Sequence, residues 1–433
     1  MPSPSPLAGA HPQPDLRTLP NGVRALAWPL PGRATVAVSV YVQAGSAHEP
    51  RHASGLTHVV EHMLFKGTAT RDARRINADA EQLGAEANAH TDKDHFALHL
   101  RGLAEHVESF VAQLADLLIA PTFPPGEIEA ERQVLLHEMT EVEDDPMAIA
   151  FQLFDRASWG LRAAARPVIG ERALLERFTR EQLVALVRER FTAPNVVVVA
   201  AGALDPEAFH RSVARHFGAL PSGPVNTLPV ADWRGGVKTR DLAGHAQTHL
   251  VLGLPAARLG EDTPLPALAA ACLGEGMGSP LMDELREKRG LLYYAACSHD
   301  TLLCGGQFVV EASTAPEQAA EAAGEVRRLL QRLAAHVPAE DLQRAQAQLA
   351  VRRVRALEEP GRLVEDSALE LLATGRLRAH HERLADLRRV DAQDLQAYFA
   401  ALLRHPMAVA ATGRVRRGLP AQLRQVLEVP LIP

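Results

Sequence analysis

The sequence predicts an α+β protein of two homologous domains, each a mainly antiparallel sheet packed with helices. Strand-like alternation is the first observation, and it is clearest where Val36, Val38, Val40 and Val42 alternate with Thr35, Ala37, Ser39 and Tyr41. Further strand-like runs cover residues 196–200, 249–252 and 408–411. Helix-forming segments of about 15 to 20 residues lie between such runs, which is typical of an α+β arrangement.

An internal duplication is the third observation. In each half, a strand-like run beginning with Phe is followed by a helix-forming segment, a helix led by Pro and an acidic-Pro turn. The corresponding positions are Phe96 and Phe308, Pro125 and Pro338, and Pro146 and Pro360, which lie 212, 213 and 214 residues apart. Such steady spacing indicates two copies of one unit of roughly 210 residues.

The duplication predicts the domain boundaries. Residues 16–219 form the first domain and residues 237–433 the second, joined by a linker over residues 220–236 that is rich in Pro and Gly. Residues 1–15 are rich in Pro and Ser and are expected to be a disordered tail.

Composition limits the function classes. The chain has 433 residues, 47% hydrophobic and 23% charged, with a net charge of −6, so neither nucleic acid nor an anionic membrane is indicated as a partner. No apolar run approaches the roughly 20 residues of a membrane span. The start of the chain does not have the pattern of a secretory signal. The three cysteines, Cys272, Cys297 and Cys304, lack metal-ligand spacing and suit a reducing compartment, so we expect a cytoplasmic protein.

The segment from His58 to His62 predicts a metal site. On a helix, residues four apart share a face, so both imidazoles can reach one ion, and Glu61 is close enough to hold a water. A surface helix with two solvated histidines is the alternative. The apolar residues around the motif favour a packed helix, for which Ser54 is the expected N-cap and Gly67 the expected stop.

A third ligand is expected from a later helix that starts at Pro124-Pro125 and ends before Pro146. Glu131 and Glu138 are seven residues apart and therefore lie on the same face of that helix. One of the two carboxylates can bind the metal while the other supports a ligand through a hydrogen bond. A solvated acidic edge is the alternative for this pair.

These motifs resemble the insulinase/pitrilysin family of metallopeptidases, whose zinc motif is of the inverzincin type. The nearest resemblance is to the bacterial branch similar to the mitochondrial processing peptidase β subunit, and it runs from about residue 19 to 413. The resemblance implies that His58, His62 and Glu138 bind one Zn²⁺ per chain, that Glu61 is the general base, and that Glu131 is the supporting acid. His137, beside the third ligand, is expected not to bind the metal because its ring points about 100° away on a helix.

The second copy is expected to lack the metal. A glycine-rich segment, residues 274–281, stands where the first copy has its histidines, and Val351 stands opposite Glu138. This segment lacks the Lys-Ser/Thr ending of a phosphate-binding loop. By resemblance, Arg289 and Tyr293 help to bind substrate, although Pro280 replaces an arginine that the family usually has. The alternative for Arg289 is a surface salt bridge.

Residues 86–91 are predicted to form a short strand. By resemblance, it is an edge strand on which Asn88 and Ala89 bind the substrate backbone, and His90 replaces an aromatic residue of the family. His90, His95 and His99 are rival ligand candidates, but the alternation of a strand sends neighbouring side chains to opposite faces.

The resulting prediction is a zinc-dependent endopeptidase that hydrolyses peptides or unfolded segments with a water activated by Glu61 and zinc, inside a clamshell chamber. The alternatives are an inactive scaffold or core subunit of the same fold, and a dedicated maturase of one small peptide. By resemblance, a homodimer is the expected assembly, with a heterodimer containing an inactive paralogue as the rival, and neither nucleic acid nor a membrane is an expected partner.

Overall fold

The computed structural model describes residues 13–429, which form two compact units, each built around one sheet. Most of the predicted tail, residues 1–12, therefore lies outside the described residues, although Asp15 already belongs to a strand. In residues 13–429, no helix has both the length and the apolar character that crossing a bilayer requires.

The first unit contains a six-stranded sheet with the order β1-β2-β6-β3-β5-β4, so that β4 is an edge strand. All neighbouring strands pair antiparallel except β2 and β6. The strands are β1 (Asp15–Thr18), β2 (Arg24–Pro29), β3 (Thr35–Val42), β4 (Glu86–Thr91), β5 (Phe96–Leu103) and β6 (Val196–Gly202). The predicted ranges 35–42 and 86–91 are confirmed.

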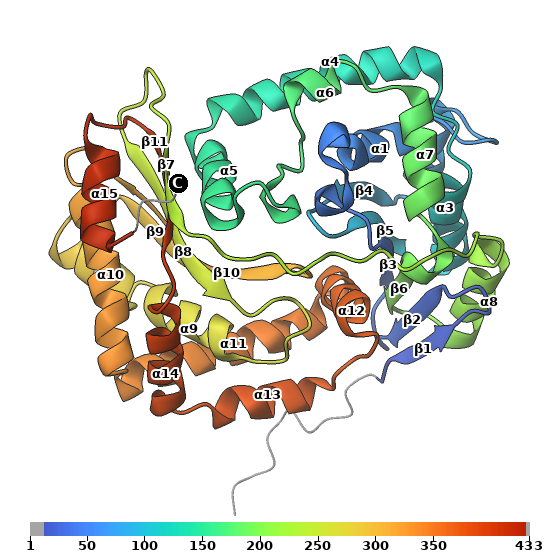
Figure 1. Ribbon diagram of the computed structural model, residues 1–433. Helices are drawn as coiled ribbons and strands as arrows, with labels where there is room; N and C mark the ends of the chain where they lie inside the picture. The colour runs from blue at the N-terminus through green and yellow to red at the C-terminus, as the bar shows by residue number, and fades with distance from the viewer. Residues whose placement is uncertain (1–12, 430–433) are drawn as a thin grey trace, which may run out of the picture. The chain divides into compact units, whose positions relative to one another are not determined.

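Helices cover both faces of this sheet (Figure 1). The helix α3 contacts β3 and β5 on one face, and α12 contacts β3 and β6 on the other, so the central strand β3 is buried along almost its whole length. The helices of the first unit are α1 (Leu56–Leu64), α2 (Ala73–Gln82), α3 (Val107–Ile119), the start of α4 (Pro125–Asp144), α6 (Arg172–Leu175), α7 (Arg180–Arg190), α8 (Pro206–Phe217) and α12 (Pro360–Thr374).

The second unit repeats this topology. Its sheet has the order β7-β11-β8-β10-β9, and only β7 and β11 are parallel, which matches the order and directions of β2-β6-β3-β5-β4. The strands are β7 (Gly236–Thr239), β8 (Thr248–Ala256), β9 (Tyr294–Leu302), β10 (Gly305–Thr314) and β11 (Ala408–Gly413). The predicted duplication and the mainly antiparallel α+β fold are thus confirmed.

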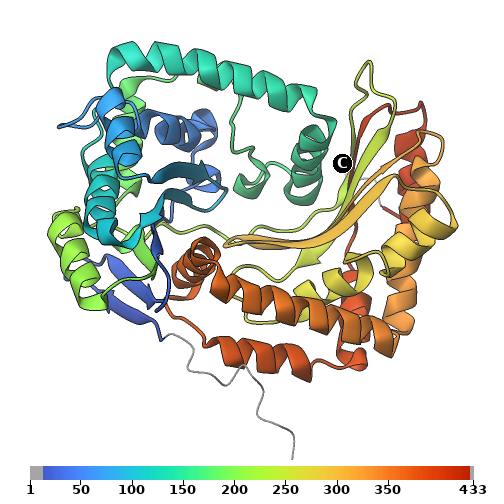
Figure 2. The same ribbon diagram turned by 180° about the vertical axis from the view of Figure 1, so that it is seen from behind.

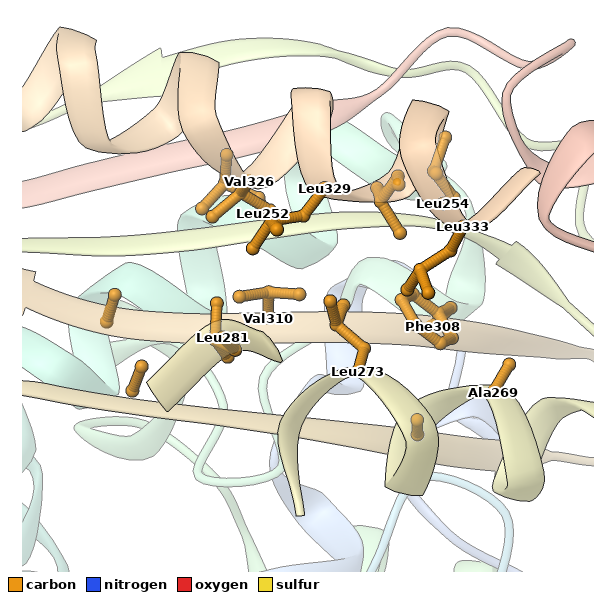
Figure 3. Packing of buried hydrophobic residues seen from close by; sticks show 14 of the residues in the cluster. Leu252, Leu254, Ala269, Leu273, Leu281, Phe308, Val310, Val326, Leu329 and Leu333 are labelled. Atoms are coloured by element: carbon orange, nitrogen blue, oxygen red, sulfur yellow. The ribbon is translucent and has the colours of Figure 1, made fainter. Parts of the chain in front are cut away.

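One face of the second sheet carries a large apolar cluster (Figure 3). Phe308 and Val310 of β10 pack there with Leu329 and Leu333 of α10 and with Leu273 of α9. The helices of this unit are α5 (Pro146–Trp159), α9 (Leu265–Gly274), α10 (Ala319–Ala335), most of α11 (Ala339–Glu358), α13 (His380–Arg389), α14 (Ala392–Leu402) and α15 (Leu419–Leu427), with a π-helical segment at Leu281–Lys288.

The compact units depart from the predicted contiguous domains in one respect, because two segments are exchanged. Residues 136–167 belong to the second unit and residues 356–377 to the first (Figure 2). The cause is the apolar faces of α5 and α12. Phe154 of α5 packs on Val251 and Val309 of the second sheet, whereas α12 packs on the first sheet. The dividing line falls after Leu135, inside the unbroken helix α4.

Candidate metal centre

The helix α1 presents the two histidines of the motif. Val59, Val60, Met63 and Leu64 are 0% exposed and hold the helix against the first unit. His58 is 8% exposed, and its ring centroid lies 4.8 Å from that of His62 at an interplanar angle of 78°. Burial, followed by the neighbouring His62, lowers the pKa of His58 to about 4. The imidazole of His58 is therefore neutral at pH 7, which is the form that binds a metal.

The N-terminus of α1 differs from the prediction. The N-cap is Gly55 with φ +94°, and its side-chain-free backbone approaches Gly170, since a Cβ on Gly55 would meet the Cα of Gly170 at 2.7 Å. Ser54 provides no cap, so its predicted role was wrong. Instead, the buried carboxylate of Glu49 accepts hydrogen bonds from the backbone N–H of Gly55 at 2.7 Å and of Thr57 at 2.6 Å.

Glu49→Ala is expected to lower the free energy of unfolding by about 1 to 3 kcal/mol, because two N–H groups at a buried helix start lose their acceptor. Urea denaturation followed by circular dichroism measures the change. Glu49→Gln is the matched control, since its amide keeps one acceptor oxygen and should lose less. Equal stability of wild type and Glu49→Ala would refute this capping role.

The helix α4 brings acidic side chains to α1. Arg132 holds the start of α4 in place, since its guanidinium lies 4.1 Å from the ring centroid of Phe178 and donates to the Phe178 carbonyl at 3.0 Å. One residue earlier, Glu131 is 5% exposed and accepts a hydrogen bond from Nδ1 of His62 at 2.7 Å. Because Nδ1 of His62 is engaged in this way, Nε2 is the nitrogen left to bind a metal.

Lys66 is a second partner of Glu131. Its ammonium lies 2.5 Å from Oε2 of Glu131, while Oε1 contacts His62. Burial alone would raise the pKa of the Glu131 carboxyl, but the hydrogen bonds from His62 and Lys66 outweigh it and lower the pKa. Glu131 is therefore an anion that orients the His62 ring.

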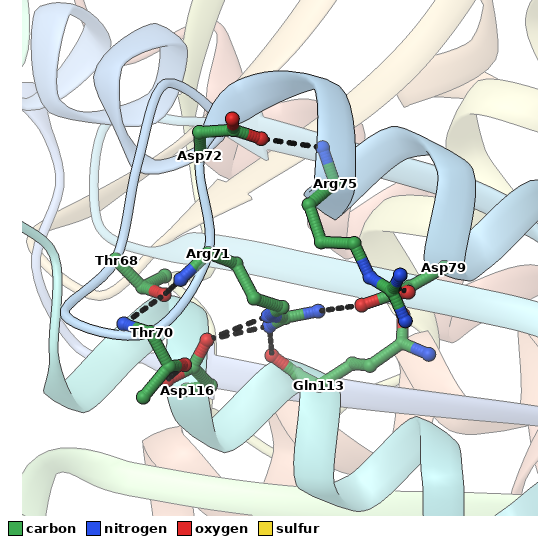
Figure 4. A network of polar contacts seen from close by, with 8 residues as sticks. All are labelled: Thr68, Thr70, Arg71, Asp72, Arg75, Asp79, Gln113 and Asp116. Atoms are coloured by element: carbon green, nitrogen blue, oxygen red, sulfur yellow. Dashed lines mark hydrogen bonds and ion pairs between the residues drawn. The ribbon is translucent and has the colours of Figure 1, made fainter.

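The loop that carries Lys66 away from α1 is fixed by Arg71 (Figure 4). Its guanidinium donates to Asp116 of α3 at 2.7 and 2.8 Å and lies 3.5 Å from Asp79 of α2. The hydroxyl of Thr68 accepts from the backbone N–H of Arg71 at 3.1 Å. The loop that follows Lys66 is thus tied to both α2 and α3.

Glu138 completes the group. It follows Glu131 by two helical turns on the unbroken α4, and one ligand atom each from His58, His62 and Glu138 all lie within 4.8 Å of one another. Two imidazoles and one carboxylate are a donor set that suits zinc, and three protein ligands leave a position open for water. The exposed His137 is not part of this group. Glu61, next to His62 on α1, is half-buried.

The candidate substrate-binding strand has the expected position. β4 pairs with β5 on one side only, with Asn88 opposite His99 and His90 opposite Ala97. The backbone N–H of Ala89 donates to Oδ1 of its neighbour Asn88 at 2.8 Å. The rival ligand candidates His90, His95 and His99 bond to one another on this part of the sheet.

In the second unit, Arg289 and Tyr293 lie on either side of Gly290. Arg289 is 40% exposed in its side chain and forms ion pairs with Glu321, at 2.7 Å, and with Glu325, both on α10. Tyr293 is 56% exposed. The salt-bridge alternative thus describes what Arg289 does in this structure, and substrate binding by these two residues stays a prediction.

Three features of the site and its surroundings were not predicted from the sequence. They are the Glu49 cap, the contact of Lys66 with Glu131, and the hydrogen bonds that join the histidines beside β4. Lys66 carried a usable signal, since it follows His62 by four residues and so points in a similar direction. Glu49 carried none, because its bonds cross a loop of irregular backbone.

Two family models match this chain, and together they cover most strands of both sheets. The model described as insulinase (peptidase family M16) matches residues 28–172, and the model described as the peptidase M16 inactive domain matches residues 177–349.

Similar proteins with curated names extend over almost the whole chain. A protein of Mycobacterium tuberculosis, named an uncharacterized zinc protease, is 30% identical over 430 residues, covering 95% of this chain and 96% of its own. An uncharacterized zinc protease of Rickettsia felis is 28% identical over 391 residues, covering 88% and 93%.

Two solved structures share the fold. A protease from Helicobacter pylori has a TM-score of 0.85 at 19% identity, covering 93% of this chain and 99% of that one. A peptidase M16 inactive domain from Pseudomonas fluorescens has a TM-score of 0.86 at 21% identity, covering 93% and 98%.

Proposed function

Because this chain belongs to the insulinase family of peptidases, family M16, we propose that it is a zinc-dependent endopeptidase acting on peptides or unfolded segments. The observation that carries the proposal is the convergence of His58, His62 and Glu138, whose ligand atoms lie within 4.8 Å of one another. The neutral His58 and the oriented His62 ring favour metal binding further.

Each residue of the site then has a chemical task. His58, His62 and Glu138 would hold the zinc, which, when bound, would polarise the scissile carbonyl and make a water more acidic. Glu61 would take a proton from the attacking water and later deliver it to the leaving amine. Glu131 keeps the His62 ring oriented, and Lys66 keeps Glu131 charged.

Substrate binding is assigned to the edge strand β4. An extended peptide adds to an unpaired sheet edge through main-chain hydrogen bonds, which accept many sequences. Asn88 and Ala89 would meet the peptide, and the Asn88 side chain would leave the Ala89 N–H to free that donor. Arg289 and Tyr293 are the proposed contacts in the second unit.

Two alternatives remain, of which the scaffold belongs to another class and the maturase is itself a peptidase. A scaffold that has lost catalysis has no need for the acid-base residue Glu61 or for a buried acid that orients a ligand, so the complete set argues against it. A maturase of one small peptide has the same site and differs only in the residues that select the substrate. Cleavage-site profiling on a peptide library separates a maturase from a general peptidase.

A homodimer is the proposed assembly, because one chain carries both the zinc motif and the Arg289/Tyr293 pair and needs no complementary partner. A heterodimer with an inactive paralogue is the rival. The mass of the purified protein in solution distinguishes a homodimer from a monomer that requires another chain.

The function is tested by chelation. The purified chain is expected to cleave an unfolded peptide, to lose this activity in 1,10-phenanthroline, and to regain it with a stoichiometric amount of Zn²⁺. Non-chelating 1,7-phenanthroline is the matched control and should leave the rate unchanged. Cleavage that persists in the chelator after zinc has been removed would contradict the proposal.

A further inference from the structure

Five side chains of the first unit form one continuous hydrogen-bonded chain beside the edge strand. It runs from Asp94 Oδ1 to His95 Nδ1 at 2.9 Å, and from His95 Nε2 to His90 Nε2 at 3.1 Å. It continues from His90 Nδ1 to His99 Nε2 at 3.0 Å and from His99 Nδ1 to Ser39 Oγ at 2.8 Å. His90 therefore uses both ring nitrogens, and the chain connects β4 to β5, to β3 and to the β4–β5 turn.

This hydrogen-bonded chain of side chains is mostly buried. Asp94, His95 and Ser39 are 2 to 4% exposed and His99 is 9% exposed. Tyr41 forms its wall, with ring centroids 5.5 Å from His99, 5.7 Å from His95 and 6.2 Å from His90. In such a place each broken hydrogen bond has a substantial free-energy cost, so the chain strengthens the hold on β4.

Counting hydrogens limits the charge of the chain. Three neutral imidazoles carry three ring N–H hydrogens, and each of the two nitrogen–nitrogen contacts needs one hydrogen between its nitrogens. The two outer nitrogens, on His95 and His99, can each carry one more. The intact chain thus holds at most four ring hydrogens, which is one proton above neutral. A second extra proton places two N–H groups face to face and breaks a contact.

We propose that His90 is a positioning residue that holds β4 ready to receive a peptide, and that this hold lasts only while the three imidazoles share no more than one extra proton. The proposal rests on the proposed peptidase function for its substrate. It gives His90 a role in peptide binding, and it predicts a pH dependence of that binding that the metal site does not produce.

The surrounding charges favour His95, at one end of the hydrogen-bonded chain, as the site of the first extra proton. Burial opposes protonation of His95, but the hydrogen bond and charge of Asp94 outweigh it and raise the pKa of His95. Burial, followed by the neighbouring His95, lowers the pKa of His90 against the opposing charges of Glu365 and Asp92. Burial, followed by the neighbouring His90 and Arg101, lowers the pKa of His99 to about 3. The charged groups that act on the three histidines are Glu365 of α12, Arg101 of β5, and Asp92 and Asp94 of the turn. Arg362 and Asp366 of α12 act on the adjoining Tyr41, and His48 interacts with Asp94.

The direction of the pH effect follows. A histidine whose pKa is lowered by folding contributes its full stabilisation at pH values above its ordinary pKa, which is near 6.5. This stabilisation is lost as the pH falls from there toward the lowered pKa. His90 and His99 are of this kind. The hold on β4 is therefore complete at pH 7.5 and weakens below about pH 6.

The experiment compares wild type with His90→Phe, which keeps a ring of similar size and removes both nitrogen–nitrogen contacts. The KM of wild type is expected to rise about tenfold more than that of His90→Phe between pH 7.5 and pH 5, with zinc in excess. Both proteins share the metal site, so its titration cancels in the comparison and kcat should change in parallel. Ser39→Ala, which keeps both contacts, should retain the wild-type pH response.

Hydrogen exchange gives a readout that needs no activity. Protection factors of residues 86–91 in the full-length wild type are expected to fall at pH 5 relative to those of β5, and to change less in His90→Phe. Equal pH responses of the two proteins in both measurements would overturn the proposal. Absence of chelator-sensitive cleavage would instead remove the peptidase function, and hydrogen exchange would still test the role of His90.

Discussion

Glu61→Gln is expected to lower kcat by about 100- to 10,000-fold while the protein keeps its zinc. The amide has nearly the shape of the carboxylate but cannot take a proton from water. Glu61 is also outside the group of three ligand side chains, so its replacement leaves the metal donors in place. Steady-state cleavage of an unfolded peptide, together with the metal content measured by plasma mass spectrometry, tests this expectation.

His137→Gln is the matched control for this variant. His137 is exposed and lies beside Glu138 without joining the ligand group, so its replacement should change neither kcat nor zinc content. A Glu61→Gln protein that cleaved at the wild-type rate would show that another group is the base. Loss of zinc from that protein would show that Glu61 is a ligand.

The second large effect is expected from the two acids of α4, which should behave differently. Glu138→Ala removes one of three ligands and is expected to abolish zinc retention and activity. Glu131→Gln leaves all three ligands but weakens the hold on the His62 ring, so zinc affinity should fall by about 10- to 100-fold. Competition with a chromogenic chelator measures both affinities.

The contrast between these two acids identifies which one binds the metal. If Glu131→Gln lost the zinc and Glu138→Ala kept it, the roles would be reversed. Glu129→Gln is a useful control on the same helix, because Glu129 is exposed and its carboxylate bonds to Arg132.

The parts of the fold that follow local patterns were predictable from the sequence. Alternating valines gave the bounds of β3, and prolines gave the ends of α4 at Pro125 and Asp144. The pair of histidines on one helix and the two acids on another were found by spacing, since residues four or seven apart share a helical face.

Features that depend on distant segments were not predictable. An apolar stripe on α5 or α12 indicates that the helix is covered, but not which of two similar sheets covers it. Glu49 caps α1 from an irregular loop, where no periodic pattern applies. The histidine chain was missed because alternation separates neighbours along a strand, whereas His90 and His99 meet across two strands and His95 joins them from a turn.

The placement of α12 on the first sheet has a consequence for the order of folding. Trp28 donates to the hydroxyl of Ser367 at 3.0 Å across a separation of 339 residues, and α12 covers Leu26, Val197 and Val199. A ribosome must therefore make more than four-fifths of the polypeptide before the earliest strands can bury their apolar side. Contacts this remote in sequence slow folding. The nascent chain therefore exposes the apolar face of its first sheet for most of its synthesis.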